Sequence, residues 1–393
     1  MSNYHQLSLR QGKEQPIKRF HPWIFSGAIQ KIPKLNAGDL VEVMSWQGEV
    51  LGYGFYETGS LAVKLFSFGE EPIGDFWLRK FQAALRLRET TGLTPEPGSN
   101  AYRLIFSEGD GMPGLIIDFY DGTAVLQANS IGMYAMRRHF TECLQQIYGE
   151  TLKAVYDKSA ETLRKQAGYE TTDGFLFGDC ATTVISEHGC AFRVDLIAGQ
   201  KTGFFLDQRD NRRIVAQHAA GRKILNTYCY SGGFSVAALK AGALLVHSID
   251  SSKKAIQLTE DNLRLNGFDP QTHQCLAVDA MQYLDQMSQG WDLIILDPPA
   301  FAKHVSQRHK ALTAYRHINR EAIKNLTPGG LLFTFSCSQV VDTEQFTAIV
   351  MAAAIEAGRQ VKIIRHLGHP ADHPVSIFHP EGSYLKGLML YIE

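Results

Sequence analysis

The stretch KILNTYCYSGGFSVAALKAGALLVHSID, residues 223–250, decides the fold. It begins with an apolar run that predicts a strand over Lys223–Tyr228, and after a Ser-Gly-Gly turn its spacing predicts a helix over Gly233–Ala241. A second apolar run, Leu244–Asp250, predicts another strand and ends in a carboxylate. A strand, a helix and a strand in this order are typical of the βαβ unit of a parallel sheet.

The same alternation continues to the end of the chain. Strands are predicted over Gln274–Asp279, Trp291–Asp297, Leu331–Ser336, Val361–Leu367 and Leu388–Ile392. Helical spacing falls between them, over Lys253–Asn266, Ala280–Ser288, His309–Asn325 and Thr343–Ala357. We therefore predict an α/β domain over 186–393 with a doubly wound parallel sheet, whose ligands bind beyond the carboxyl ends of the strands.

Two smaller domains are predicted upstream of this sheet. Residues 1–70 contain short extended runs, among them Leu40–Val43 and Val50–Phe55, separated by glycine turns, which is typical of a small β-barrel. Residues 71–185 begin with a helical pattern over Phe76–Thr91 and contain another over Met133–Tyr148, so this middle segment is predicted to be a small α+β domain.

Charge, cysteine content and the N-terminal sequence exclude several kinds of protein. The formal net charge is -1 and the sequence pI is about 6.9, so a protein that coats nucleic acid non-specifically is excluded, and any such contact must come from local patches. The six cysteines form no CxxC pair, which favours a reducing compartment. The N-terminus has no apolar segment of a signal peptide, so we expect a soluble, cytoplasmic protein.

Three strand ends carry the residues of a cofactor site. Gly232 lies in the turn after the first strand, Asp250 ends the second and Asp279 ends the third. A glycine turn lets the backbone approach a ligand, and acidic strand ends can bind ribose hydroxyls and an adenine amine. The pattern departs from G-x-G-x-x-G, so it favours an adenosine-containing cofactor other than a nicotinamide.

The next two strand ends carry candidate catalytic residues. Asp297 is followed by two prolines that hold its carboxylate rigidly, and Phe301 can stack on a planar base. Cys337 follows the neighbouring strand, and it is either a small buried apolar residue or a nucleophile. Its place beside Asp297 favours a thiolate that adds to cytosine C6 and activates C5, which requires a lowered thiol pKa.

These residues lie in motifs that resemble a known family. The motifs are GQKTGFFLDQR (199–209), YCYSGGFS (228–235), LDPPAF (296–301) and SCS (336–338). They resemble the PUA-domain class I methyltransferases that form 5-methylcytosine in large-subunit ribosomal RNA, and the resemblance covers essentially the whole chain. It implies a seven-stranded Rossmann-like sheet, a PUA-like β-barrel, S-adenosylmethionine as cofactor and RNA as partner, with no membrane; whether the chain forms a homodimer stays open.

The resemblance also implies roles for individual residues. Cys337 is expected to be the nucleophile and Asp297 to bind the cytosine edge. Cofactor contacts are expected from Thr202, Arg209, Tyr228, Gly232, Asp250, Ser251, Asp279, Ala280 and Asp297. Related RNA cytosine-5 methyltransferases carry a second cysteine directly after Asp-Pro-Pro, where this chain has Ala300, so the release step is unassigned.

Two features leave alternatives open. Four histidines between His366 and His379 invite a zinc site, but three of them precede proline and no cysteine accompanies them, so we expect a loop at the substrate entrance and no metal. Basic residues from Arg308 to Arg320 could bind RNA phosphates or form a solvated helix face. Two rival functions also stay open: methylation of a purine nitrogen without the thiol, and a non-catalytic RNA-binding assembly factor.

Overall fold

The structure is a computed structural model, and it describes residues 4–94, 98–163, 170–288 and 290–393. The chain divides into two compact units. Unit 1 contains Met1–Thr183, Val194–Phe204 and Ala371–Gly382, and unit 2 contains Val184–Arg193, Phe205–Pro370 and Ser383–Glu393. The chain passes between the units within β11 (Thr182–Glu187) and β12 (Cys190–Asp195). The three domains predicted above, 1–70, 71–185 and 186–393, stay a prediction.

The first part of unit 1 is a five-stranded sheet in the order β1-β3-β4-β5-β2. Its alternating pattern is clear in β3, where Val41 and Val43 are fully buried between half-buried neighbours. These valines join a small core of the first 70 residues. The elements are β1 (His5–Ser8), α1 (Gln15–Lys18), β2 (Trp23–Phe25), β3 (Leu40–Met44), β4 (Val50–Tyr56) and β5 (Leu61–Ser67).

A second five-stranded sheet, in the order β10-β9-β8-β7-β6, follows in unit 1. Its elements are α2 (Phe76–Thr90), β6 (Ala101–Phe106), β7 (Leu115–Tyr120), β8 (Thr123–Ala128), α3 (Ile131–Ala135), α4 (Arg137–Tyr148), β9 (Ala154–Asp157), α5 (Ala160–Leu163) and β10 (Gly174–Phe177). The helix predicted over Met133–Tyr148 is two consecutive helices that meet at Met136. A single apolar periodicity continues across the junction, which explains why the sequence did not separate them.

A fully buried ion pair joins distant segments of unit 1. The Arg88 side chain on α2 is 0% exposed, and its Nη2 donates to Oδ2 of Asp110 at 2.9 Å. The same guanidinium donates to the backbone oxygens of Arg103 (2.8 Å) and Asp372 (2.9 Å). Arg88 therefore connects α2, β6 and the 371–382 segment.

The sheet of unit 2 has seven strands in the order β15-β14-β13-β16-β17-β19-β18. The strands are β13 (Lys223–Thr227), β14 (Leu245–Asp250), β15 (His273–Ala277), β16 (Trp291–Leu296), β17 (Leu326–Ser336), β18 (Val361–Leu367) and β19 (Lys386–Ile392). The first five are parallel, and β19 runs antiparallel between β17 and β18. Every strand predicted for this sheet is present, and the bounds differ by a few residues.

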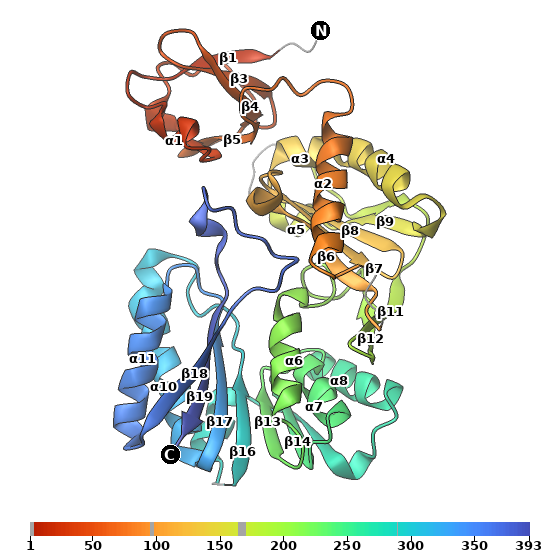
Figure 1. Ribbon diagram of the computed structural model, residues 1–393, viewed down its shortest axis with the longest axis vertical. Coiled ribbons are helices and arrows are strands. Elements are labelled where there is room, and N and C mark those ends of the chain that lie inside the picture. Colours follow the sequence, from red (N-terminus) through yellow and green to blue (C-terminus); the bar gives the residue numbers. More distant parts are fainter. Residues whose placement is uncertain (1–3, 95–97, 164–169, 289) are drawn as a thin grey trace. The chain divides into compact units, whose positions relative to one another are not determined.

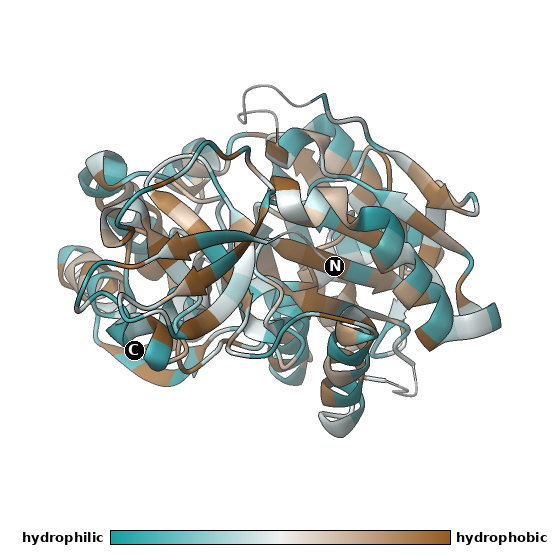
Figure 2. Cartoon of the chain, turned by 90° about the horizontal axis from the view of Figure 1, so that it is seen from above, coloured by the Kyte–Doolittle hydropathy of each residue, from teal (hydrophilic) through white to brown (hydrophobic). Residues whose placement is uncertain are grey.

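Helices cover this sheet on both sides, with α6, α7 and α8 on one side and α10 and α11 on the other (Figure 1). The helices are α6 (Arg209–Gln217), α7 (Gly233–Lys240), α8 (Lys253–Leu265), α9 (Ala280–Gln286), α10 (Arg308–Asn325) and α11 (Thr343–Ala357). Figure 2 shows hydrophobic residues concentrated on the strands and hydrophilic residues spread over the helices. No helix among the described residues is long and apolar enough to cross a membrane.

The order of the strands marks a position for ligands. The chain builds outward from β13 through β14 to β15, and then returns to the other side of β13 with β16 and β17. The strand order thus reverses between β13 and β16. In open parallel sheets, ligands bind at the carboxyl ends of the strands that flank such a reversal.

We expect Arg88→Leu to lower the free energy of unfolding by about 3–5 kcal/mol, because it leaves the Asp110 carboxylate buried without its partner. Arg86→Leu, on the exposed face of the same helix, is the matched control and should change stability by less than about 0.5 kcal/mol. Urea denaturation measures both. Equal losses in the two variants would contradict the assigned role of the buried pair.

Candidate functional site

The turn after β13 is sharply folded. Tyr228 (φ 57°), Tyr230 (φ 47°) and Gly232 (φ 73°) all have left-handed backbone conformations. Such conformations cost a non-glycine residue about 1 kcal/mol or more and persist only where the surroundings impose them. Here the hydroxyl of Thr259 donates to the Tyr230 oxygen at 2.9 Å, and the Asn262 amide donates to the Ser231 oxygen at 2.8 Å.

Gly232 is required at its position in this turn. Besides its positive φ, a Cβ atom added there would lie 2.6 Å from Cγ2 of Thr259, a distance that real Cβ contacts do not show. Gly232 also precedes the first residue of α7, so the backbone N–H groups at the start of that helix point out of the turn. The turn thus presents bare backbone at the carboxyl end of β13.

The carboxylate of Asp250 is fixed beside this turn. Its Oδ2 accepts from the Tyr230 N–H at 3.1 Å, and its Oδ1 accepts from the Ser252 N–H at 2.9 Å. Ser251, next along the chain, is exposed. Two backbone bonds orient the carboxylate and leave its remaining lone pairs for a ligand, as hydrogen bonds from ribose hydroxyls require.

Asp279 does not end its strand, contrary to the sequence-based expectation. β15 ends at Ala277, and Asp279 caps the N-terminus of α9 by accepting from the Gln282 N–H at 3.0 Å. Ala280 is the buried first residue of that helix. Helix capping is a structural reason for an aspartate here, and it leaves Oδ2 for another partner.

One buried hydroxyl beside Asp279 fits a ligand. The Tyr228 hydroxyl is buried and has no hydrogen-bond partner among the described residues. Burial raises its pKa well above the usual value, and the nearby Asp279 carboxylate raises it further. A buried hydroxyl without a partner costs free energy, so a polar molecule bound beside it would be favoured.

Asp297 and Cys337 lie at the ends of two paired strands. β16 and β17 are parallel, with Leu296 opposite Thr334, so Asp297 and Cys337 both follow the carboxyl ends of their strands. Both residues are partly exposed, and the thiol lies 3.9 Å from the Pro298 oxygen. The thiol is therefore not enclosed in the core, and the predicted juxtaposition of the two strand ends is present.

The Ser-Cys-Ser segment is held from two other elements. The Tyr315 hydroxyl on α10 lies 3.0 Å from Oγ of Ser338. The buried Lys386 ammonium donates to the Ser338 oxygen at 2.8 Å and to the Val341 oxygen at 2.6 Å. The Phe301 ring, which we expected to stack on a base, packs against Tyr315 at 4.8 Å between ring centroids, so one of its faces is already covered.

The charges around the thiol are negative. Burial raises the pKa of Asp297 to about 7, and repulsion by Asp207 adds to this, although the Gln208 amide donates to Asp297 at 3.0 Å. Burial raises the pKa of Cys337 to about 12, with further contributions from Asp297 and Asp207 that Lys386 offsets in part. The sequence-based expectation of a lowered thiol pKa is therefore not met.

Four residues near Asp297 and Cys337 were not predicted from the sequence, namely Asp207, Gln208, Tyr384 and Lys386. Asp207 and Gln208 lie within the quoted FLDQR segment, but no role was assigned to them. The Tyr384 hydroxyl donates to Oδ2 of Asp207 at 2.6 Å, and Oδ1 of Asp207 is buried without a hydrogen-bond partner in the described part of the chain. Tyr384 and Lys386 precede and begin the last strand, and only the antiparallel pairing of β19 with β17 brings them here.

Arg209 and Thr202 are engaged elsewhere. Arg209 is 1% exposed and pairs with Glu187 at 3.6 Å, and Arg212 binds the same carboxylate at 2.6 and 2.7 Å. Burial alone would raise the pKa of Glu187, but the two guanidiniums hold it below its usual value. Thr202 belongs to unit 1, where its hydroxyl donates to Asp118 at 2.5 Å. Their roles toward a cofactor stay predictions.

Other sequence-based interpretations have a structural setting as well. Cys229, within the YCYSGGFS motif, is buried, and burial raises the pKa of its thiol, as is usual for a cysteine that only packs in the interior. On α10, Arg316 lies 3.4 Å from Glu356 and Arg320 lies 2.7 Å from Glu321. These ion pairs favour the solvated helix face over a phosphate-binding surface for that part of the basic segment.

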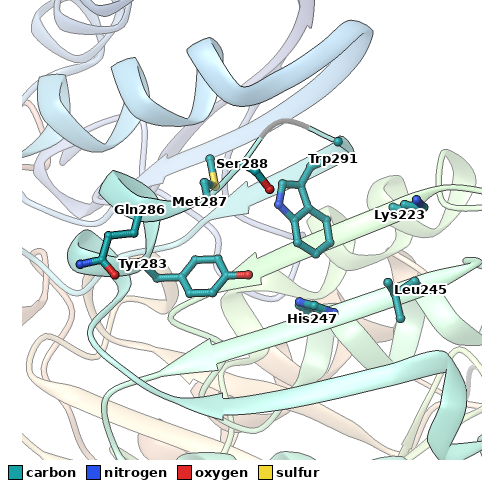
Figure 3. Close-up of a pocket in the computed structure, with 9 residues that line it drawn as sticks. Lys223, Leu245, His247, Tyr283, Gln286, Met287, Ser288 and Trp291 are labelled. Carbon is teal, nitrogen blue, oxygen red and sulfur yellow. The ribbon is translucent and has the colours of Figure 1, made fainter.

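A hollow of about 520 Å³ opens at the amino ends of the strands, opposite the candidate site (Figure 3). It is lined by Lys223, Leu245 and Trp291, the first residues of β13, β14 and β16, and by His247 and Tyr283 among others. The amino ends of parallel strands lie away from the carboxyl ends that carry Asp250, Asp297 and Cys337. This hollow is therefore separate from the candidate site.

Known proteins resemble this chain over its whole length. The S-adenosylmethionine-dependent methyltransferase family matches residues 135–381, and the PUA-like domain family matches residues 7–68. Ribosomal RNA large subunit methyltransferase I of Serratia proteamaculans (strain 568) is 39% identical, with 97% of this chain and 98% of that protein covered. The protein of the same name from Enterobacter sp. (strain 638) is 38% identical, with 97% and 98% covered.

Solved structures share the fold. A chain from Streptococcus mutans, described as a SAM-dependent methyltransferase, has a TM-score of 0.83 at 23% identity, and the match covers 98% of this chain and 99% of that one. A second methyltransferase structure, complexed with SAH, has a TM-score of 0.82 at 24% identity, with 98% and 99% covered.

Fold and site together define an S-adenosylmethionine-dependent methyltransferase with a PUA-like N-terminal domain. The chain belongs to the family of the ribosomal RNA large subunit methyltransferase I proteins, which it matches at 38–39% identity over nearly its full length. Its cofactor is S-adenosylmethionine. The glycine turn, the oriented Asp250 and the buried Tyr228 hydroxyl fit such a group.

We expect Gly232→Ala to lower the free energy of unfolding by about 2 kcal/mol, because it adds backbone strain and a clash with Thr259. Calorimetric titration should also show weakened S-adenosylmethionine binding. Gly242→Ala is the control, since Gly242 has a positive φ of 88° but open space around it. Losses of the same size in both variants would show that the clash with Thr259 has no effect.

The raised pKa of Asp297 predicts a pH-dependent stability. Because its folded-state pKa of about 7 lies above the ordinary 3.8, the folded protein binds this proton more tightly than the unfolded chain. Stability from this group is therefore present at low pH and is lost as the pH rises toward 7. Asp297→Asn should become more stable relative to the wild type across this window, by at most about 4 kcal/mol, and no further above it.

Urea denaturation at several pH values between about 4 and 8 measures this difference. Asp179→Asn, at an exposed carboxylate outside the site, is the control and should show a flat difference. A flat difference for Asp297→Asn as well would mean that its carboxyl group titrates normally.

Proposed function

We propose that this chain methylates C5 of a cytosine in large-subunit ribosomal RNA through a covalent bond between Cys337 and C6 of the base. The observation that carries the proposal is the placement of a thiol and a carboxylate, Cys337 and Asp297, at neighbouring carboxyl strand ends. The shared name of the relatives, matched over nearly the full chain, supports ribosomal RNA as substrate.

In this proposal the cofactor binds at the carboxyl ends of β13, β14 and β15, the strands that precede the reversal of strand order. Asp250 and Ser251 bind the ribose, while Asp279, Ala280 and the Tyr228 hydroxyl face the adenine. Gly232 provides the bare backbone of the turn. Arg209 supports this edge through its ion pair with Glu187. When bound, S-adenosylmethionine supplies a methyl group from a positively charged sulfonium, which a site rich in carboxylates attracts.

The first chemical step uses both catalytic residues. Cytosine C5 is a poor nucleophile until the ring conjugation is broken. The sulfur of Cys337 bonds to C6, the C5–C6 π electrons shift toward C4 and N3, and neutral Asp297 protonates N3 while it takes up the thiol proton. A carboxyl group with a pKa of about 7 suits this relay, because it is present in both protonation states near neutral pH.

Release reverses the addition after C5 has gained its methyl group. A base removes the C5 proton, that electron pair re-forms the C5–C6 double bond, and the departing sulfur takes a proton from Asp297 as Asp297 regains the N3 proton. Ala300 stands where a second cysteine would serve. We assign the C5 proton to Asp207, whose Oδ1 has no hydrogen-bond partner in the parts of the chain that are described.

The two rival functions predict different behaviour. Methylation of a purine nitrogen needs the Asp297 carboxylate and no thiol, so it would be insensitive to Cys337. An assembly factor without activity would not need a raised carboxyl pKa beside a partly exposed thiol, and these two features favour an enzyme.

RNA containing 5-fluorocytosine tests the covalent step. Because fluorine cannot leave C5 as a proton does, the wild type with S-adenosylmethionine should form a complex that survives denaturing electrophoresis. Cys337→Ala should form none, and its methyl transfer to normal RNA should fall at least about 100-fold. Cys180→Ala, at a cysteine outside the site, is the control and should retain both.

Two outcomes would reject the mechanism. Full methyl transfer by Cys337→Ala would indicate chemistry without the thiol, as in purine methylation. Calorimetry that detects no S-adenosylmethionine binding to the wild type would favour the assembly factor. Sequencing of the trapped RNA identifies the target base.

A further inference from the structure

Three side chains in unit 1 bring possible metal-ligand atoms together. His21 lies between α1 and β2, and His379 and Glu381 lie in the 371–382 segment that precedes β19. Their ligand atoms all lie within 4.8 Å of one another. Glu381 reaches both imidazoles, with Oε1 3.5 Å from Nε2 of His21 and Oε2 3.8 Å from Nε2 of His379.

His379 is the member that points to a ligand. It is only 2% exposed, and neither Nδ1 nor Nε2 has a hydrogen-bond partner within the described residues. Two unsatisfied ring nitrogens in a buried imidazole are costly, and such groups call for a specific explanation.

The surroundings hold this ring in place. The Trp23 ring packs edge-on against it at 4.4 Å between centroids, and the Trp23 indole N–H donates to Glu108 at 2.9 Å. Phe378, beside His379, packs on Phe20 at 5.2 Å between ring centroids. The segment that carries His379 and Glu381 is therefore packed against residues 20–23 within unit 1.

We propose that His21, His379 and Glu381 bind one divalent transition-metal ion of the zinc type. Two imidazoles and a carboxylate are a donor set that zinc accepts, at bond lengths of about 2.0–2.2 Å. Tetrahedral ligands at such distances lie about 3.4 Å apart, so the separations present here need only a small contraction. Water completes the coordination, and the ion ties residue 21 to the 371–382 segment.

Binding requires one change of tautomer. The Trp23 backbone N–H donates to Nδ1 of His21 at 3.3 Å, which places the His21 proton on Nε2. Coordination through Nε2 moves that proton to Nδ1, so the ring gives up this long hydrogen bond, and no net proton is released.

A second cluster provides an internal control. Asp285, His317 and Glu321 in unit 2 also have ligand atoms within 4.8 Å. Its members already have partners, because Nε2 of His317 lies 2.8 Å from Asp285 and Glu321 pairs with Arg320 at 2.7 Å. This cluster lacks a buried imidazole without partners, so it is not assigned a metal.

The test uses the full-length protein after treatment with a chelator. Calorimetric titration with Zn²⁺ should show one site per chain in the wild type. His379→Ala and His21→Ala should each weaken binding at least about 10-fold, and His317→Ala should leave it unchanged. Zn²⁺ should raise the thermal midpoint of the wild type and of His317→Ala, and not that of His379→Ala.

Co²⁺ gives a spectroscopic readout that does not depend on stability or activity. Four-coordinate Co²⁺ with imidazole ligands should produce intense visible absorption bands in the wild type that Glu381→Gln alters. Glu381 is about half exposed, so this variant should fold even if His379→Ala does not. Absence of Zn²⁺ binding by the wild type, or binding that only His317→Ala removes, would overturn the proposal.

Discussion

The parallel pairing of β16 with β17 is the constraint on which the placement of the candidate catalytic residues depends. Leu296 lies opposite Thr334, and the two strands end with Asp297 and Cys337 at the same border of the sheet. A register shift by one residue would turn one of these side chains to the other face of the sheet. The buried apolar residues of both strands and of α10 and α11 hold this register, so core packing positions the chemistry.

Acidic groups lie close together at this border of the sheet and repel one another when charged. Two carboxylates, Asp207 and Asp297, lie near the Cys337 thiol. The nearby Lys386 ammonium donates to two backbone oxygens and offsets the charge of the carboxylates only in part. Both the carboxyl and the thiol pKa values are raised, so protons are retained there. A cationic cofactor bound at this border would relieve the repulsion.

Local patterns made most of the sheet of unit 2 predictable. Apolar runs and helical spacing are properties of short segments, and the strand and helix bounds followed them within a few residues. Asp297 and Cys337 could be paired because strand order follows from βαβ topology. Asp279 was misplaced because a carboxylate just after a strand can equally cap the next helix, as it does for α9.

What the sequence could not indicate are contacts between distant segments. Tyr384 reaches Asp207 only because β19 runs antiparallel beside β17, and Arg212 meets Glu187 through the hairpin of β11 and β12. The four histidines between His366 and His379 were considered for zinc only among themselves. The partner that the structure brings to His379 is His21, near the other end of the chain, and no spacing rule connects residues so far apart.

Two parts of the chain are held in place in different ways. The candidate catalytic residues Asp297 and Cys337 lie at adjacent strand ends that are backed by a buried core, which holds side chains rigidly. The 371–382 segment has no such strand to support it, because it is a long connection between β18 and β19. Its attachment relies on buried polar contacts instead, namely the Arg88 bond to Asp372 and the cluster at His379.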